Sequence, residues 1–170
     1  TGPSDAPSGY NAKDVTRDPA TDLCPGVNRT QVLDSSLAFR TFNYTRAGQL
    51  VVTRVNVFST AAEAEAAIAA TQVSTASCDG KGVGAGTTGE TWKMMPESDL
   101  TIDGAVQTSA TVMQILGGTP ASPRSVEGVL AIYARVGDLL IYAAATDRAT
   151  AVWYAQLMVA RANEEVPPPK

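Results

Sequence analysis

The sequence predicts an α+β domain, in which two main helices pack on an antiparallel β-sheet. Segments with an apolar period of two residues outnumber segments with a helical period, and they come in pairs joined by short turns. The clearest pair covers residues 126–136 and 139–146, which Gly137 and Asp138 join as a two-residue hairpin turn. Antiparallel hairpins combined with helices predict a layered domain, and we expect the helices on one side of the sheet.

An earlier hairpin and a helix follow the same logic. Residues 37–44 and 50–58 are β-prone, and residues 46–49 between them read as the hairpin loop. A helix is predicted over residues 61–76, because Thr60 and Glu63 have the spacing of a capping box and alanine dominates the segment. Its small side chains allow this helix to lie close to a sheet.

Further elements complete the predicted domain. A short β-prone segment covers residues 91–95, and a longer strand covers residues 105–116. A loop is expected at residues 117–123, which contain two glycines and two prolines. Asp147 is the expected N-cap of a terminal amphipathic helix over residues 149–163.

Composition divides the chain into three parts. Residues 1–22 are rich in Gly, Pro, Ser, Asp and Thr, and they predict a flexible N-terminal arm or tether. Residues 23–164 form the predicted single domain, and residues 165–170 form a Pro-rich tail. A chain of 170 residues with 44% hydrophobic residues is large enough to bury a core.

Charge and histidine content exclude several classes of function. The formal net charge is −4 and the basic residues form no cluster, so we expect no nucleic-acid partner. The chain has no histidine, which excludes Ser–His and Cys–His nucleophile pairs and His-ligated zinc. We therefore predict a protein that is not an enzyme and that carries no cofactor and no metal.

A glycine-rich segment carries a weak nucleotide-binding pattern. Residues 84–89 read G-x-G-x-x-G. A dinucleotide turn needs a strand before it and a helix after it, so that the phosphate meets a helix N-terminus. Here the predicted helix ends before the glycines and no helix follows, so we expect no nucleotide at this segment.

The two cysteines, Cys24 and Cys78, allow three interpretations: a disulfide, two buried free thiols, or reactive chemistry. A C-x-x-C redox motif is absent, and both cysteines lie at the boundaries of predicted elements. A bridge would close a loop of about 55 residues and stabilise the domain by about 4 kcal/mol. A disulfide is the favoured interpretation, and it predicts an oxidising compartment.

Candidate ligand-binding residues come from two places. Trp92 and Met94 can line an apolar pocket or pack as ordinary core. The hairpin at residues 126–146 is apolar on both faces, so it must be covered twice or leave a groove. We therefore predict a cleft between the sheet and the terminal helix, with plain core packing as the alternative. The candidate residues of this cleft are Tyr133, Tyr142, Trp153 and Met158.

The segment "VVTRVNVFSTAAEAEAAIAATQVSTASC" resembles the central part of the PknH-like extracellular sensor domains of actinobacteria. In that family a strand runs into an Ala-rich helix that ends at a disulfide cysteine, which corresponds to Cys78. The hairpin "GVLAIYARVGDLLIYAAA" and its following helix resemble the C-terminal half of the family. The resemblance implies an antiparallel sheet with helices and a cleft. It also implies a kinase ectodomain, a lipoprotein or a secreted protein, with a ligand that is generally unknown.

That family commonly carries two disulfides, whereas this chain has cysteines for one. We predict an extracytoplasmic, non-catalytic ligand-binding or sensor-type domain that is tethered to the cell envelope. Its expected partner is a small molecule or an envelope component, and its expected membrane contact is an N-terminal anchor before Thr1. The alternative is a secreted protein-interaction or structural module without a small-molecule ligand. An enzyme that uses carboxylates such as Asp99 and Asp103 is a third possibility, although a solvated loop explains this pair better.

Overall fold

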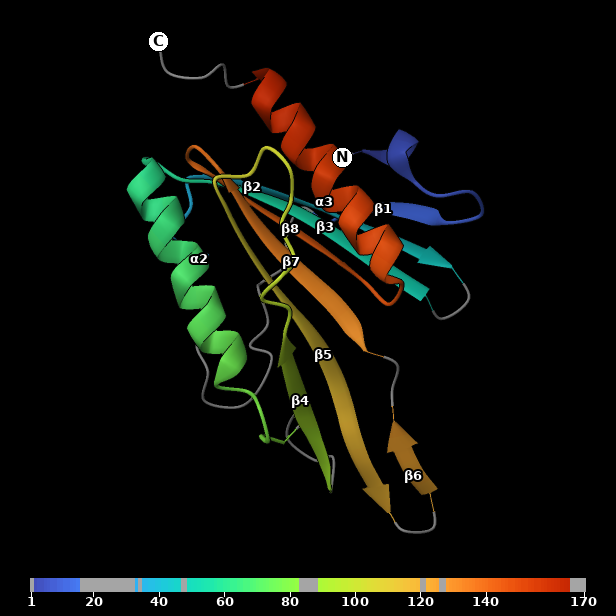
Figure 1. The fold of residues 1–170 in the computed structure, drawn as a ribbon. Helices are drawn as coiled ribbons and strands as arrows, with labels where there is room; N and C mark the ends of the chain where they lie inside the picture. Colours follow the sequence, from blue (N-terminus) through green and yellow to red (C-terminus); the bar gives the residue numbers. More distant parts are fainter. Residues whose placement is uncertain are drawn as a thin grey trace.

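The computed structural model describes residues 2–15, 33, 35–46, 49–82, 89–119, 122–125 and 128–165 (Figure 1). Within these described residues, two helices and eight strands follow a short 3-10 turn. In chain order these are η1 (Pro3–Asp5), β1 (Asn11–Val15), β2 (Ala38–Arg46), β3 (Gln49–Val57), α2 (Ala61–Ala76), β4 (Glu90–Pro96), β5 (Gln107–Thr119), β6 (Ser122–Ser125), β7 (Val129–Val136), β8 (Leu139–Ala145) and α3 (Arg148–Glu165).

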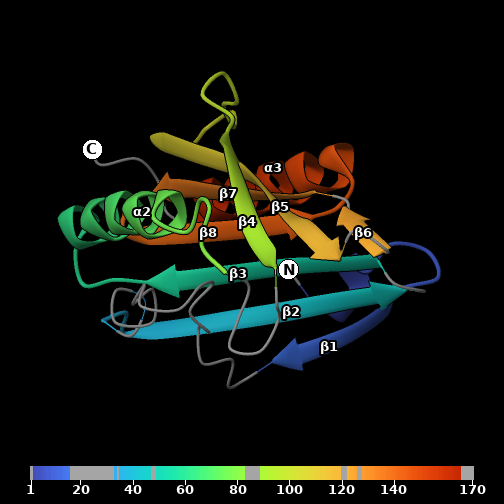
Figure 2. The same cartoon turned by 90° about the horizontal axis from the view of Figure 1, so that it is seen from below.

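The strands form one antiparallel sheet, in the order β1-β2-β3-β8-β7-β5-β4, and β6 pairs with β5. The view from below shows β1, β2 and β3 together on one side of the molecule (Figure 2). The predicted α+β class is therefore confirmed. The hairpin with Gly137 and Asp138 at its turn is confirmed as β7 and β8, which occupy the middle of the sheet.

The two helices lie on opposite faces of the sheet, so the expectation of helices on one side is wrong. Ile132 and Ile141 of the central hairpin pack with residues of α3 in the largest core cluster. Tyr133 and Leu140, their neighbours in sequence, pack with residues of α2 in a second cluster. Successive residues of a strand point to opposite faces. A hairpin that is apolar on both faces therefore requires a helix on each.

Both helices begin where the sequence predicts. At the start of α2, the Thr60 hydroxyl accepts a hydrogen bond from the Glu63 N–H (3.2 Å), and the Glu63 carboxylate accepts one from the Ser59 N–H (3.0 Å). At the start of α3, the Asp147 carboxylate accepts hydrogen bonds from the N–H and the hydroxyl of Thr150 (2.7 and 2.6 Å). The hydroxyl hydrogen bond lowers the pKa of Asp147, which keeps the capping carboxylate ionised.

Residues 2–15 do not form a free arm. They form η1 and β1, and β1 pairs with β2 from Asn11–Thr45 to Val15–Thr41. The interpretation of residues 1–22 as a flexible tether is therefore wrong for residues 2–15, and residues 16–22 lie outside the described residues. An edge strand with exposed side chains needs no apolar alternation, because backbone hydrogen bonds to one neighbour hold it. This explains why the sequence pattern did not reveal it.

The predicted loop at residues 117–123 is mostly paired. β5 continues to Thr119, and β6 begins at Ser122 and pairs back onto it. Proline within β6 is compatible with a strand that has one hydrogen-bonded partner. None of the helices in the described ranges has the length and apolar character that crossing a bilayer requires.

Cys78 follows α2 and is completely buried. It is not a free thiol but a disulfide-bonded cysteine. Cys24 is the one other cysteine of the sequence, and it lies outside the described residues. The pairing of Cys24 with Cys78 within one chain therefore stays a prediction.

This pairing predicts a monomer whose mass is that of the chain minus two hydrogens. A digest without reductant should release one cross-linked peptide pair that contains Cys24 and Cys78. Intact-mass and peptide mass spectrometry of protein produced under oxidising conditions measure both. Two thiols that react with iodoacetamide in the folded or unfolded protein, or a disulfide between two chains, would contradict the pairing.

Candidate functional site

The sheet extends beyond both helices at the end formed by β4, β5 and β6 (Figure 1). After α2 the chain turns back along the outer edge of β4. Gly80 adopts a φ of 74° in this turn, and its N–H donates to the Trp92 carbonyl (2.8 Å). The Trp92 N–H donates to the Lys81 carbonyl (2.9 Å), and the Asp79 carboxylate accepts from the Met94 N–H (2.8 Å). These contacts cover the edge of β4 and hold Met94 near the C-terminal end of α2.

A cleft with a volume of about 370 Å³ lies between the C-terminal half of α2 and the corner formed by β4 and β5. This volume falls in the lower part of the range that holds drug-sized ligands. Most of the surface that lines it is apolar, and the buried side chain of Met94 forms part of it. The residues that line it are Gln72, Ala76, Met94, Pro96, Glu97, Ser98, Thr108, Ser109, Ala110 and Thr111.

Several polar side chains of the cleft have no partner among the described residues. Gln72 of α2 and the hydroxyls of Ser109 and Thr111 of β5 make no such hydrogen bond. Thr108 is different, because its hydroxyl oxygen already accepts a hydrogen bond from the Ile102 N–H (3.2 Å). One of these groups belongs to α2 and two belong to β5, and all three line the same cleft.

A third unpartnered hydroxyl belongs to Thr75, which lies on α2 next to the lining residue Ala76. Its side-chain oxygen is buried and has no hydrogen-bond partner, and the residue is only 3% exposed. A buried hydroxyl without a partner lowers stability by about 1–3 kcal/mol. Polar groups left in this state are uncommon in folded proteins, and they often mark a place that a bound molecule or water completes.

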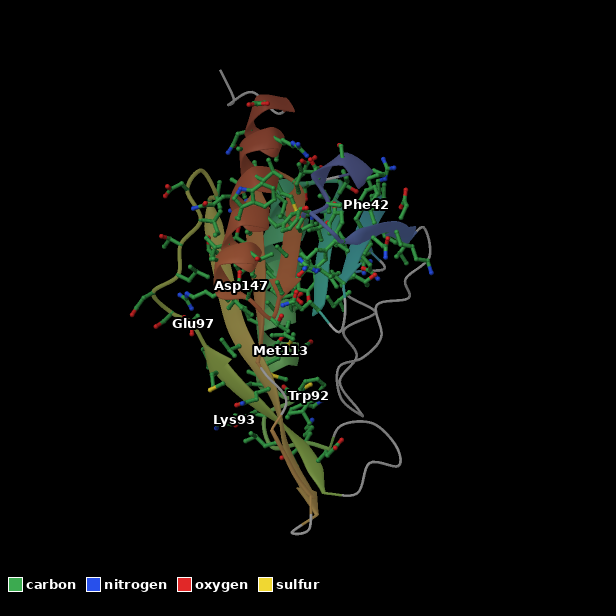
Figure 3. The ribbon with its side chains drawn as sticks, turned by 90° about the vertical axis from the view of Figure 1, so that its right-hand side faces the viewer. Phe42, Trp92, Lys93, Glu97, Met113 and Asp147 are labelled. Atoms are coloured by element: carbon green, nitrogen blue, oxygen red, sulfur yellow. The ribbon has the colours of Figure 1, made fainter. Side chains whose placement is uncertain are left out.

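The cleft carries little net charge. Its one acidic side chain, Glu97, forms an ion pair with Arg148 (2.7 Å) at the start of α3. Arg148 does not line the cleft, and no lysine or arginine is among the ten residues that do. Figure 3 labels Glu97 above the end of the sheet where Trp92 and Met113 lie.

The predicted ligand-binding residues do not form one site. Tyr133 and Tyr142 pack against each other on the α2 face of the sheet, with tilted rings whose centroids are 4.8 Å apart. Met158 is buried under α3 on the opposite face. Trp153 points away from the sheet and is 52% exposed. The predicted cleft between the sheet and α3 is therefore not assembled from these four residues, because strand alternation places two of them on the other face.

Trp92 and Met94, the other two predicted ligand-binding residues, lie at or next to the cleft between α2 and β5. Met94 lines the cleft between α2 and β5. Trp92 is half-buried and packs against the cluster of Cys78, Met94 and Met113. Trp92 and its neighbour Lys93 lie on opposite sides of β4 in Figure 3. Met94 is thus the one predicted residue that reaches the cleft, and Trp92 supports it from the adjoining core.

The sequence analysis missed Gln72, Ser109 and Thr111. A signal for the last two exists in "QTSATVMQIL", where Ser109 and Thr111 share a face with Met113 and precede it. Hydroxyls followed by an apolar side chain on one strand face predict a partly open surface. Gln72 carries no comparable signal, because exposed glutamine is common on helices.

A second groove, of about 570 Å³, lies beside α3. It is bounded by the N-terminal segment and by the first turns of α3. Its lining residues are Ser4, Asp5, Ala6, Pro7, Ala149, Thr150, Trp153 and Tyr154. The exposed indole of Trp153 therefore forms part of a groove, although α3 and η1 make that groove rather than α3 and the sheet.

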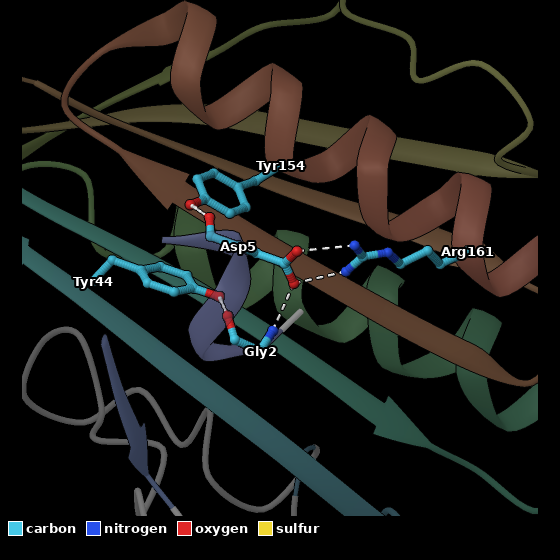
Figure 4. A network of polar contacts seen from close by, with 5 residues as sticks. All are labelled: Gly2, Asp5, Tyr44, Tyr154 and Arg161. Atoms are coloured by element: carbon cyan, nitrogen blue, oxygen red, sulfur yellow. Dashed lines mark hydrogen bonds and ion pairs between the residues drawn. The ribbon is translucent and has the colours of Figure 1, made fainter. Parts of the chain in front are cut away.

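A polar network holds the N-terminal segment in place (Figure 4). The Asp5 carboxylate accepts two hydrogen bonds from the Arg161 guanidinium (2.7 and 2.9 Å) and one from the Gly2 N–H (2.7 Å). The Tyr154 hydroxyl donates to the Asp5 carbonyl (2.5 Å), and the Tyr44 hydroxyl donates to the Gly2 carbonyl (3.1 Å). The hydrogen bonds from Arg161 lower the pKa of Asp5, and burial raises the pKa of Tyr154 well above its usual range.

No group of three or more potential metal ligands occurs within the described residues. Asp99 and Asp103 are exposed and lie in the connection between β4 and β5, in agreement with a solvated loop. Most of the G-x-G-x-x-G segment, residues 83–88, lies outside the described residues, so the expectation about nucleotides stays a prediction.

Comparison by sequence finds no matching family model and no matching curated protein. Comparison by structure finds similar folds in two mycobacterial proteins. One is the extracellular domain of PknH from Mycobacterium tuberculosis, with a TM-score of 0.52 and 13% identity over 94% of this chain and 81% of that chain. The other is an uncharacterized protein from Mycobacterium smegmatis, an Rv0999 ortholog, with a TM-score of 0.50 and 12% identity over 93% and 92% of the two chains. The resemblance to PknH-like domains is therefore confirmed for the fold.

The Asp5–Arg161 ion pair provides a pH-dependent prediction. The substitution Asp5→Asn should lower the free energy of unfolding by about 1 kcal/mol at neutral pH, since the carboxylate is buried but Arg161 is partly solvated. The folded-state pKa of Asp5 lies below 3.8, so this stabilisation is present above that value and disappears as the pH falls through the folded pKa. Urea unfolding at several pH values measures the difference.

The matched control is Asp14→Asn, because the Asp14–Arg40 ion pair is of similar length (2.9 Å) but much more exposed. This control should change the free energy of unfolding by no more than a few tenths of a kcal/mol. Equal losses for the two variants, or an Asp5→Asn loss that persists in strong acid, would show that the ion pair does not hold the N-terminal segment.

Proposed function

We propose that this protein is a non-catalytic, extracytoplasmic domain of the sensor type, which binds a small molecule or an envelope component in the cleft between α2 and β5. One observation carries the proposal. The unpartnered polar groups of Gln72, Ser109 and Thr111 converge on a cleft whose lining is otherwise mainly apolar. A concave, mainly apolar site with a few convergent polar groups is the usual form of a small-molecule site.

Two further observations support an extracytoplasmic location. The disulfide-bonded state of Cys78 fits an oxidising environment outside the cytoplasm. The fold is similar to that of an extracellular domain from Mycobacterium tuberculosis. Attachment to the membrane through a segment before Thr1, by a lipid or by a transmembrane helix, belongs to the proposal.

The non-catalytic part of the proposal rests on the chemistry available at the cleft. The one carboxylate there, Glu97, is already paired with Arg148 at 2.7 Å. The hydroxyls of Ser109 and Thr111 have no basic side chain among the residues that line the cleft with them. Such hydroxyls hold a ligand well but are weak nucleophiles.

A second candidate function is protein interaction through the groove beside α3. Trp153 is half-exposed in this groove, next to Pro7 and Ala149. Exposed tryptophan is common at the energetic centres of protein interfaces. This observation favours the interaction module over the sensor domain, and the experiment below distinguishes the two.

The test incubates the folded protein with extracts of mycobacterial envelope lipids and soluble metabolites, and native mass spectrometry then detects retained molecules. The wild type should retain a small molecule. Ala76→Trp should reduce retention about tenfold or more, because an indole at this position fills the cleft and removes the contacts of the ligand.

Ala62→Trp is the matched control, because Ala62 is an exposed alanine in the first turn of the same helix and does not line the cleft. It should retain the molecule as well as the wild type does. Equal retention by Ala76→Trp would contradict binding in the cleft. Retention that only Trp153→Ala abolishes would move the site to the groove beside α3.

A further inference from the structure

The chemistry of the cleft restricts the class of ligand beyond its location, and this step rests on the function proposed above. The cleft offers hydrogen-bonding groups that are uncharged, namely the Gln72 amide and the hydroxyls of Ser109 and Thr111. An amide and a hydroxyl can each donate and accept. They therefore suit hydroxyl and amide groups of a ligand better than a carboxylate or an ammonium group.

The charged residues around the cleft also favour an uncharged ligand. An anionic ligand would lose its hydration in the cleft without meeting a cation, because none of the lining residues is a lysine or an arginine. It would also lie near the Glu97 carboxylate. A cationic ligand finds that carboxylate already neutralised by Arg148 at 2.7 Å. A buried charge without a partner is strongly disfavoured, so the cleft selects against both signs.

The apolar part of the lining requires that the ligand also carry a non-polar portion. Met94 is buried and lines the cleft, and Ala76 and Pro96 border it. A fully polar molecule would leave these surfaces without a matching partner, whereas an alkyl or ring portion would bury them. The methionine thioether adapts to irregular apolar shapes, which suits a hydrocarbon portion.

We infer that the cleft binds a neutral amphiphile. An uncharged headgroup with hydroxyl or amide groups bonds to Gln72, Ser109 and Thr111, and a hydrocarbon portion lies against Met94, Ala76 and Pro96. The headgroup is uncharged, as in a glycoside or a simple amide.

The test compares three probes that share an octyl chain and differ in the charge of the headgroup. Octyl β-D-glucoside is neutral, octyl sulfate is anionic and octyltrimethylammonium is cationic. Each is titrated below its micelle concentration into the isotope-labelled full chain, and NMR measures the shifts of backbone amides. The glucoside should shift the amides of Gln72, Met94, Ser109 and Thr111, and it should bind about tenfold or more tightly than either charged probe.

Variants test the contacts with the headgroup. The double substitution Ser109→Ala and Thr111→Val removes two hydroxyls and keeps the volume, and it should weaken binding of the glucoside about tenfold. It should leave the affinity for octyl sulfate nearly unchanged. Thr45→Val is the control, because Thr45 is an exposed strand residue on β2, far from the cleft in the sheet order. It should bind all three probes as the wild type does.

Three results would overturn the inference. Octyl sulfate or octyltrimethylammonium could bind as tightly as the glucoside, the glucoside could shift no amide of the cleft, or the double variant could keep full affinity. None of these results contradicts the proposed function, which depends on the loss of extract-derived ligand in Ala76→Trp. Loss of that retention together with tight binding of a charged probe would keep the cleft as the site and change the class of its ligand.

Discussion

The β7–β8 hairpin is apolar on both of its faces, and the rest of the structure follows from this constraint. Ile132, Ala134 and Ile141 are buried on one face, and Tyr133 and Leu140 are buried on the other. A strand pair of this kind cannot leave either face in water without losing a large part of the hydrophobic stabilisation. One helix on each face satisfies the requirement, and the remaining strands extend the sheet outward from the hairpin.

The two helices differ in how much of their sheet face they cover, and this difference creates the candidate site. α3 contributes the large buried side chains of Tyr154, Met158 and Val159, and the N-terminal segment extends its cover over Tyr44 of β2. α2 buries mainly alanine and threonine, with Ile68 as its one large buried side chain. α2 ends at Ala76, while β4 and β5 continue beyond it (Figure 1). The sheet beside the last turn of α2 is therefore covered incompletely, and the cleft lies there.

The sequence predicted the elements that carry strong local signals. The capping residues Thr60 and Asp147 mark the starts of the helices, and the Gly137–Asp138 turn marks the central hairpin. The edge strand β1 was missed, because its side chains are mostly exposed and so lack a period-two apolar pattern. β6 was missed because its residues were read as part of a loop.

The site was harder to predict than the fold. The apolar composition of the hairpin indicated a groove, but it could not say which face would be covered less. That outcome depends on the length of α2 relative to β5 and on the size of the side chains that α2 buries. Met94 was identified because thioethers suit pockets, whereas Gln72 became a candidate only when α2 was placed beside Ser109 and Thr111. The predicted ligand contacts Tyr133 and Met158 proved instead to belong to two separate cores, on opposite faces of the sheet.

Native-state hydrogen exchange tests the central claim, that the doubly covered β7–β8 hairpin determines the stability of the domain. Amides of residues 130–134 and 140–144 should exchange only through global unfolding, because both faces of these strands are covered. Amides of β1 and β4, at the two ends of the sheet order, should exchange through local openings of lower free energy. Protection in β1 or β4 equal to that of β7 and β8, or exchange of the central hairpin below the global free energy of unfolding, would contradict the account.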